Sequence, residues 1–176
     1  AVVEAMQQAL GRTGLSIGDA ARVGIWQLGY LQAYEARTLQ LPLGYGTLGF
    51  GVPAALGAQA AHPDRRVICL CGDGGFLFHG QELATAMQHG LNVVTLIVND
   101  NAFGSIRRLQ EQHYQGRTIA TDLANPDFVR FAEAFGAFGR RVKHLADLPD
   151  ALVAAFASGR PAVLEIPGPI ASPACM

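Results

Sequence analysis

Two short apolar runs, each followed by a polar turn, constrain the fold of this chain more than any other feature. Residues 67–71 and 93–98 have the unbroken hydrophobicity of strands that are buried on both faces of a parallel sheet. Residues 81–89, between them, have helical spacing, and strands that are joined by a crossover helix lie parallel. The turns after the two runs, at residues 72–74 (Gly-Asp-Gly) and 99–101 (Asn-Asp-Asn), are therefore expected at the same edge of one sheet.

The remaining hydrophobic pattern alternates between helical and strand spacing. Strands are expected at residues 15–18, 138–142 and 162–166, and helices at residues 1–10, 22–34, 53–61, 125–135 and 148–156, with Asn125-Pro126 capping the fourth of these. This alternation predicts an α/β fold, a doubly wound three-layer sandwich with a mostly parallel central sheet. Residues 1–176 are expected to form a single domain, and the low charged fraction of 15% favours a domain cut from a larger chain or seated in an oligomer over a free monomer.

The composition argues against several classes of function. The net charge is −1 and there is no basic run, so the chain lacks the electrostatic footprint of nucleic-acid binding. No apolar stretch approaches the roughly 20 residues that a membrane span needs. The three cysteines do not make a disulfide framework, which predicts a reduced, cytoplasmic protein. Cys69 and Cys71 are expected to be buried small residues on opposite faces of a strand, and Cys175 to be free.

Two carboxylates and two glycines stand where the parallel strands would end. Asp73 and Asp100 offer the oxygen ligands that Mg²⁺ prefers, and the backbone carbonyl of Ala102 offers a third. The backbone N–H groups of Gly74 and Gly75, at the entry to a helix, are suited to an anion such as a phosphate. Either turn alone would most often indicate only a tight turn, but their pairing favours a site for a cation and a phosphate.

These residues resemble the cofactor motif of thiamine diphosphate enzymes. The resemblance lies in residues 72–74 (Gly-Asp-Gly) and, one helix and one strand later, residues 100–101 (Asp-Asn). Upstream, residues 46–51 and 53–55 are similar to the same group of enzymes. The likeness covers essentially the whole chain and is greatest to the C-terminal diphosphate-binding domain of the acetolactate synthase and 2-oxo-acid decarboxylase branch.

The resemblance implies a role for each residue of the motif. Asp73 would be one metal ligand, and the backbone carbonyl of Ala102 would be another. The second side-chain ligand of the family is usually an asparagine, whereas Asp100 stands at that position here, with Asn101 as the rival ligand. The residues implied to contact the cofactor are Gly72, Gly74 and Gly75 at the diphosphate, Leu48 as the wedge that bends it, Gly46 through its carbonyl, and Asp19 and Ala20 in a covering loop.

The resemblance also implies an activity for the full enzyme. The chain would bind thiamine diphosphate and Mg²⁺ in an acetolactate synthase-like lyase or transferase that decarboxylates a small 2-oxo acid and carries out a carboligation. A benzoylformate- or indolepyruvate-type decarboxylase domain, a non-catalytic cofactor-binding module and a nucleotide-binding protein are alternatives, although the chain lacks G-x-x-x-x-G-K-[ST]. The activating glutamate would lie in a pyrimidine-binding domain of the same or a second subunit. We therefore expect a homodimer or homotetramer, and an isolated chain that is inactive.

Overall fold

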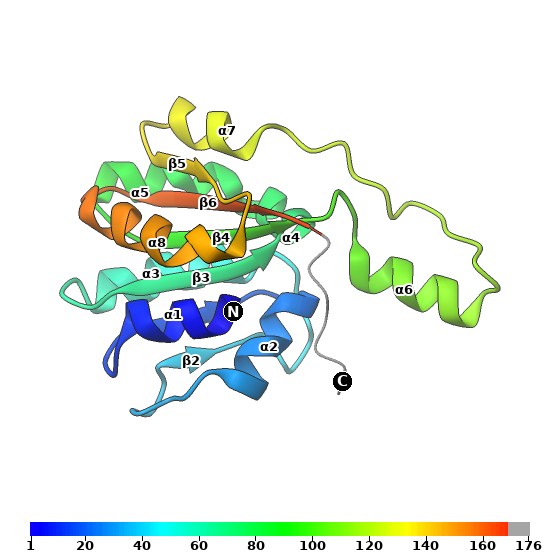
Figure 1. Ribbon diagram of the computed structural model, residues 1–176, viewed down its shortest axis with the longest axis horizontal. Helices are drawn as coiled ribbons and strands as arrows, with labels where there is room; N and C mark the ends of the chain where they lie inside the picture. Colours follow the sequence, from blue (N-terminus) through cyan, green and yellow to red (C-terminus); the bar gives the residue numbers. More distant parts are fainter. Residues whose placement is uncertain (169–176) are drawn as a thin grey trace.

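The computed structural model describes residues 1–168, and its centre is one sheet of six parallel strands (Figure 1). The strands follow the spatial order β2-β1-β3-β4-β6-β5, and every neighbouring pair is parallel. Their bounds are β1 (Leu15–Gly18), β2 (Leu39–Gln40), β3 (Val67–Gly72), β4 (Val94–Asn99), β5 (Phe138–Arg141) and β6 (Ala162–Pro167). The sheet predicted as mostly parallel is thus parallel throughout, and the two-residue strand β2 was not predicted.

The strand order contains a reversal that decides where a ligand would bind. The chain runs outward from β1 to β2 and then crosses to β3, on the other side of β1. In open α/β sheets, ligands bind outside the carboxyl ends of the strands at such a switch point. Asp19 directly follows β1 and Asp73 directly follows β3, so both residues lie at the switch point.

Helices cover both faces of the sheet, which confirms the three-layer, doubly wound fold. The helical elements are α1 (Val2–Leu10), α2 (Arg22–Tyr30), α3 (Gly51–Ala61), α4 (Asp73–His79), η1 (Gly80–Glu82), α5 (Leu83–His89), α6 (Gly104–His113), α7 (Phe128–Ala134), η2 (Leu145–Asp147) and α8 (Leu148–Ala157). Helices α1, α2 and α8 pack on one face, and α3, α4, α5 and α7 on the other. No helix within residues 1–168 is long and apolar enough to cross a membrane.

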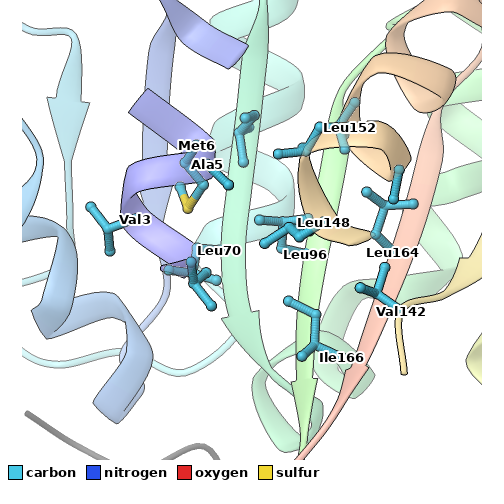
Figure 2. Packing of buried hydrophobic residues seen from close by; sticks show 14 of the residues in the cluster. Val3, Ala5, Met6, Leu70, Leu96, Val142, Leu148, Leu152, Leu164 and Ile166 are labelled. Atoms are coloured by element: carbon cyan, nitrogen blue, oxygen red, sulfur yellow. The ribbon is translucent and has the colours of Figure 1, made fainter. Parts of the chain in front are cut away.

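The core on the first face is built from aliphatic side chains (Figure 2). Met6 of α1 and Leu152 of α8 pack against the strands, where Leu70, Leu96 and Leu164 belong to β3, β4 and β6. All five are almost completely buried. Each contributes about 1.5–3 kcal/mol through the removal of apolar surface from water, so this face anchors the three central strands.

The core on the second face is partly aromatic and lies directly beneath the predicted site. Phe76 of α4 meets Phe128 of α7 edge to face, with ring centroids 5.5 Å apart. Cys69 and Cys71 of β3 belong to this core as free, buried thiols. The expectation that they point to opposite faces is wrong, because side chains two positions apart on a strand share a face. Cys175 lies outside the described residues.

Three helices differ from the sequence expectation. The helix predicted to begin at Gln81 begins at Leu83 as α5, and it is preceded by α4, which begins at Asp73, and by the short turn η1. Helix α2 ends at Tyr30 instead of residue 34. Helix α7 is capped by Asp127, whose carboxylate accepts from the backbone N–H groups of Val129 and Arg130, so the assignment of Asn125 as the cap is wrong.

Helix α6 was not among the elements expected from the sequence. It contains no buried residue, and it extends with the segment that follows it away from the sheet (Figure 1). The chain returns to the sheet near residue 125, where it enters α7. This return brings side chains of the segment back to the predicted site.

Candidate functional site

Asp73 is held by three hydrogen bonds at the first position of α4. Its Oδ1 accepts from the backbone N–H of Gly74 at 2.9 Å. Its Oδ2 accepts from the backbone N–H of Ala102 at 3.2 Å and from Nδ2 of Asn125 at 2.6 Å. A carboxylate offers about four lone-pair sites, so Oδ2 is filled, whereas Oδ1 keeps one site for a cation. The side chain is buried, with 1% of its surface exposed, and its orientation is fixed.

Asp100 follows β4 and lies close enough to Asp73 to feel its charge. Partial burial raises the pKa of the Asp100 carboxyl above its usual value, and the negative charge of Asp73 raises it further. A side chain at Gly104 would approach Asp100 Oδ2 to 2.5 Å, so the carboxylate lies against the first turn of α6. Asn101, the rival ligand, is exposed and has a left-handed backbone with φ of 53°. The structure therefore places Asp73 and Asp100 at the carboxyl ends of the neighbouring parallel strands β3 and β4, as predicted.

Asp19 links two loops and the first turn of α4 at the switch point. Its Oδ1 accepts from the backbone N–H of Ala20 at 2.8 Å, and its Oδ2 accepts from the backbone N–H of Gly49 at 3.0 Å. The same Oδ2 lies so close to Gly75 that a β-carbon there would overlap it. Asp19 is 2% exposed, so its contacts in this structure are with the protein. It holds the loop of residues 46–50 to the start of α4.

The glycines of the Gly-Asp-Gly turn serve close packing in a way that the sequence did not indicate. Gly72 precedes α4, and Gly74 and Gly75 lie in its first turn, not in a loop that leads to a later helix. A β-carbon at Gly74 would come within 2.5 Å of the Phe103 ring, as one at Gly75 would overlap Asp19. The N–H of Gly74 already donates to Asp73. Glycine is thus required at both positions for the approach of neighbouring side chains.

The loop with Gly46 and Leu48 reaches the site through its last residues. Gly46 is exposed and has φ of 68°, a conformation that favours glycine. Leu48 is half-buried, and the next residue, Gly49, is tied to Asp19. Gly49 also packs against His79 at the end of α4. Leu48 therefore sits in a loop that is anchored to both β1 and α4.

Cys71 is a buried thiol near the end of β3, the strand that Asp73 follows. The pKa of its thiol is raised well above 9.0, first by the hydrogen bond to Cys69, then by burial, and then by the charges of Cys69, Asp19 and Asp73. Cys71 is therefore protonated at neutral pH. It contributes packing to this region and does not supply a thiolate ligand.

The donor set fits a hard divalent cation. Two carboxylates that repel each other are stabilised when both bind the same cation, and Mg²⁺ takes one or two carboxylates together with phosphate and water oxygens. Within residues 1–168, no three or more His, Cys, Asp or Glu side chains are grouped so that they could hold a metal ion together. Asn125 Oδ1, adjacent to Asp73, is a buried acceptor without a donor, as a site with a polar occupant would leave it.

One residue that contacts Asp73, Asn125, was missed by the sequence analysis. Asn125 bridges Asp73 and Asn99, with its Nδ2 at 2.6 Å from Asp73 Oδ2 and at 2.8 Å from Asn99 Oδ1. The sequence feature that marks Asn125 is its position directly before Pro126, from which the sequence analysis predicts a helix cap. A residue before proline is disfavoured in the helical conformation, so that signal correctly places Asn125 outside the helix but says nothing of its partner.

Two hollows lie away from these residues. One, of about 900 Å³, is lined by residues of α1 and α2, among them Trp26 and Tyr30, and by Lys143. The other, of about 520 Å³, lies near the ends of α3 and α8 and includes Arg65 and Phe156. Neither is lined by Asp73 or Asp100. Asp73 and Asp100 therefore lie at the carboxyl edge of the sheet and outside both hollows.

Comparison with known proteins places this site in a family. A family model described as "Thiamine pyrophosphate enzyme, C-terminal TPP binding domain" matches residues 19–166. The acetolactate synthase large subunit of Parasynechococcus marenigrum (strain WH8102) is 42% identical over 125 residues, which are 70% of this chain and 20% of that protein. The acetolactate synthase of Bacillus subtilis (strain 168) is 36% identical over 149 residues, which are 85% of this chain and 26% of that protein.

A solved structure supports the same assignment. The thiamine diphosphate-dependent 4-hydroxybenzoylformate decarboxylase of Rhodococcus jostii RHA1 superposes with a TM-score of 0.82 at 30% sequence identity. The match covers 95% of this chain and 32% of that chain. The present chain thus spans between 20% and 32% of the length of these three relatives.

Proposed function

Since the chain belongs to the C-terminal TPP-binding domains of thiamine pyrophosphate enzymes, in the acetolactate synthase branch, we propose that it holds the diphosphate of this cofactor through Mg²⁺ at Asp73 and Asp100. One observation carries the proposal. The two carboxylates follow the carboxyl ends of the neighbouring parallel strands β3 and β4, beside the switch point, and Asp73 Oδ1 keeps a free lone pair.

The proposed roles of the neighbouring residues follow from their positions. The backbone carbonyl of Ala102 would complete the protein ligands, because the N–H of the same residue donates to Asp73 and holds this backbone at the site. Leu48 would support the bent cofactor, because its loop is fixed to Asp19 through Gly49. Gly46 would contribute its carbonyl, and Ala20 would lie over the diphosphate.

The first turn of α4 would bind the diphosphate. Gly74 and Gly75 lie in this turn and Gly72 directly precedes it, so these glycines are proposed as its backbone contacts. Partial positive charge at a helix N-terminus and unused backbone N–H groups favour an anion. The N–H of Gly74 also donates to Asp73, so Gly75 is the better candidate for a direct contact.

The activity proposed for the whole enzyme is decarboxylation of a small 2-oxo acid followed by a carboligation. Thiamine diphosphate supplies the chemistry at the carbonyl carbon, while the protein supplies orientation and electrostatics. The relatives are at least about three times as long as this chain, which leaves room for a pyrimidine-binding domain with the activating glutamate, in the same or a second subunit. An assembly of two or four subunits and a cytoplasmic location belong to the same proposal.

A decarboxylase without carboligation is the second candidate. It is favoured by the superposition with the Rhodococcus enzyme, whose name states that it decarboxylates 4-hydroxybenzoylformate. The two acetolactate synthases carry the higher sequence identities, 42% and 36% against 30%, and they support the first candidate. Product analysis of the full-length enzyme with pyruvate and with an aromatic 2-oxo acid distinguishes the two.

The metal assignment is tested by calorimetric titration of thiamine diphosphate with Mg²⁺ into the chain. Asp73→Ala is expected to weaken binding by more than about tenfold, because it removes a charged ligand as well as its hydrogen bonds. The matched control is Asp64→Asn, an exposed carboxylate that precedes β3 at the opposite edge of the sheet. Equal affinity of the wild type and Asp73→Ala would overturn the assignment.

The second ligand is tested with two further variants in the same titration. Asp100→Ala is expected to weaken binding, whereas Asn101→Ala is expected to bind as the wild type does, because the Asn101 side chain is exposed. Asp100→Asn restores the residue that the family usually has and is expected to retain most of the affinity. Loss of binding in Asn101→Ala alone would assign the ligand to Asn101.

A further inference from the structure

We infer that a relay of polar side chains, running from strand β6 to the site, positions Asp73 for Mg²⁺, and that Asn125 and Glu165 are its positioning residues. The inference rests on the proposed function, because Asp73 is taken as the metal ligand. Neither Asn125 nor Glu165 needs to touch the metal. They act by holding the carboxylate in the orientation that leaves Oδ1 open.

The relay begins at the metal ligand and crosses the sheet edge. Nδ2 of Asn125 donates to Asp73 Oδ2 at 2.6 Å and to Asn99 Oδ1 at 2.8 Å. Nδ2 of Asn99 then donates to Glu165 Oε1 at 2.8 Å. The other oxygen, Glu165 Oε2, accepts from Arg141 Nε at 2.8 Å. The relay thus runs from Asp73 in α4 through Asn125, which precedes α7, to Asn99 of β4, Glu165 of β6 and Arg141 of β5.

Each amide in the relay has only one orientation that satisfies its partners. Asn125 faces two acceptors, Asp73 Oδ2 and Asn99 Oδ1, so its NH₂ group must point to them. Asn99 faces the carboxylate of Glu165, so its NH₂ group points there. Its Oδ1 then accepts from Nδ2 of Asn125 and from the backbone N–H of Asn101. The carboxylate of Glu165 therefore determines the orientation of Asn99, which presents the acceptor that holds Asn125.

Glu165 is a buried charge on a strand that is otherwise apolar. It is 3% exposed, and the strand positions on both sides of it, Leu164 and Ile166, belong to the core. Arg141, its register partner on β5, is the cation that compensates it. Arg141 is exposed, so the pair is buried only on the side of Glu165, and an ion pair with a solvent-exposed partner contributes little net stability. The pair is better explained by the direction it gives to Asn99 than by a contribution to stability.

The relay also fixes the segment that returns from α6. Arg141 Nη2 lies 3.2 Å from Asp127 Oδ2, and the other oxygen of Asp127 caps α7. Asn125 and Asp127 are therefore tied down two positions apart, one to the metal ligand and one to the sheet. This explains how a long excursion of the chain away from the sheet can return a side chain to Asp73 with a defined geometry (Figure 1).

Titration with Mn²⁺ in the presence of thiamine diphosphate, followed by electron paramagnetic resonance, tests the inference without any measurement of activity. Asn125→Ala is expected to weaken Mn²⁺ binding by about tenfold or more, as loss of a partner that orients a metal ligand does. Glu165→Gln is expected to weaken it in the same direction, because the new amide presents a donor to either Asn99 or Arg141. The spectrum of the bound ion is expected to broaden in both variants.

A destabilised variant remote from the relay separates positioning from general loss of stability. Gln59→Ala removes a buried amide whose Nε2 donates to the carbonyl oxygens of His62, Pro63 and Arg65, at the other end of α3. It is expected to lower the thermal midpoint and to leave the Mn²⁺ affinity unchanged. Circular dichroism establishes that each variant is folded. The two relay variants change different residues, so each one tests the inference separately.

The outcomes distinguish this inference from the proposed function. If Asp73→Ala loses Mn²⁺ while Asn125→Ala and Glu165→Gln bind as the wild type does, the relay has no positioning role and the inference is overturned. If the wild type and Asp73→Ala bind Mn²⁺ equally, the metal assignment itself fails, and the inference fails with it. Weakened binding in both relay variants, with normal binding in Gln59→Ala, supports the inference.

Discussion

Two glycine-to-alanine substitutions in helices of this protein are predicted to have opposite effects on stability. Gly75 lies in the first turn of α4, where an added β-carbon would overlap Asp19 Oδ2. Gly57 lies in α3, where an added β-carbon would meet no atom within 4 Å. Since alanine forms helix better than glycine by about 1 kcal/mol, the pair isolates the effect of the contact with Asp19.

The magnitude follows from the hydrogen bonds that Asp19 would lose. Its carboxylate accepts from the N–H groups of Ala20 and Gly49, and a hydrogen bond to a charged group contributes about 1.5–3 kcal/mol. Displacement of the carboxylate from one or both donors lowers the free energy of unfolding by about 2–4 kcal/mol. The gain in helix propensity offsets about 1 kcal/mol of this. Gly75→Ala is therefore expected to destabilise by about 1–3 kcal/mol, and Gly57→Ala to stabilise by about 0.5–1 kcal/mol.

Equilibrium unfolding in urea measures both values, provided that the slope with denaturant concentration is unchanged. A double-mutant cycle sharpens the result, because in an Asp19→Ala background the added methyl group at residue 75 has no carboxylate to displace. Gly75→Ala is expected to cost little in that background. Equal stabilisation by Gly75→Ala and Gly57→Ala in the wild type would refute the role assigned to the contact between Asp19 and α4.

Two further predictions concern regions outside the site. Gln59→Ala is expected to lower the free energy of unfolding by about 1–3 kcal/mol, because three carbonyl oxygens lose one shared buried donor. Urea unfolding measures this, with exposed Gln112 of α6 as a control site for the same substitution. The backbone N–H of Arg130 and the charge of Arg141 lower the pKa of Asp127 below its usual value of 3.8. Stability that depends on this carboxylate is present above pH 3.8 and is lost as the pH falls through the lowered pKa. Asp127→Asn, which keeps a capping side chain, is therefore expected to show a shallower loss of thermal midpoint below pH 4 than the wild type; identical profiles would contradict this.

The strand and helix order could be predicted because it depends on local patterns. The apolar runs that became β3 and β4 are unbroken, as strands buried on both faces are, and the connection between them forces them to lie parallel. This is why Asp73 and Asp100, far apart in the sequence, were correctly expected at one sheet edge. The start of α4 could not be predicted in the same way, because Gly-Asp-Gly has the composition of a turn. Only the burial of Phe76 and the packing of Asp19 and Phe103 on the two glycines make it a helix.

The sequence by itself determined the family, the three layers of the fold and the two carboxylates of the candidate site, because motif and periodicity are properties of short segments. The tertiary structure alone decided how Asp73 is oriented. Its partner Asn125 lies 52 positions away, and Asn99 lies 66 positions from Glu165, so neither contact follows from any local pattern. Such contacts exist only after the sheet has aligned its strands and the segment after α6 has returned to it. A hydrogen bond depends on position within tenths of an ångström, which a sequence pattern does not specify.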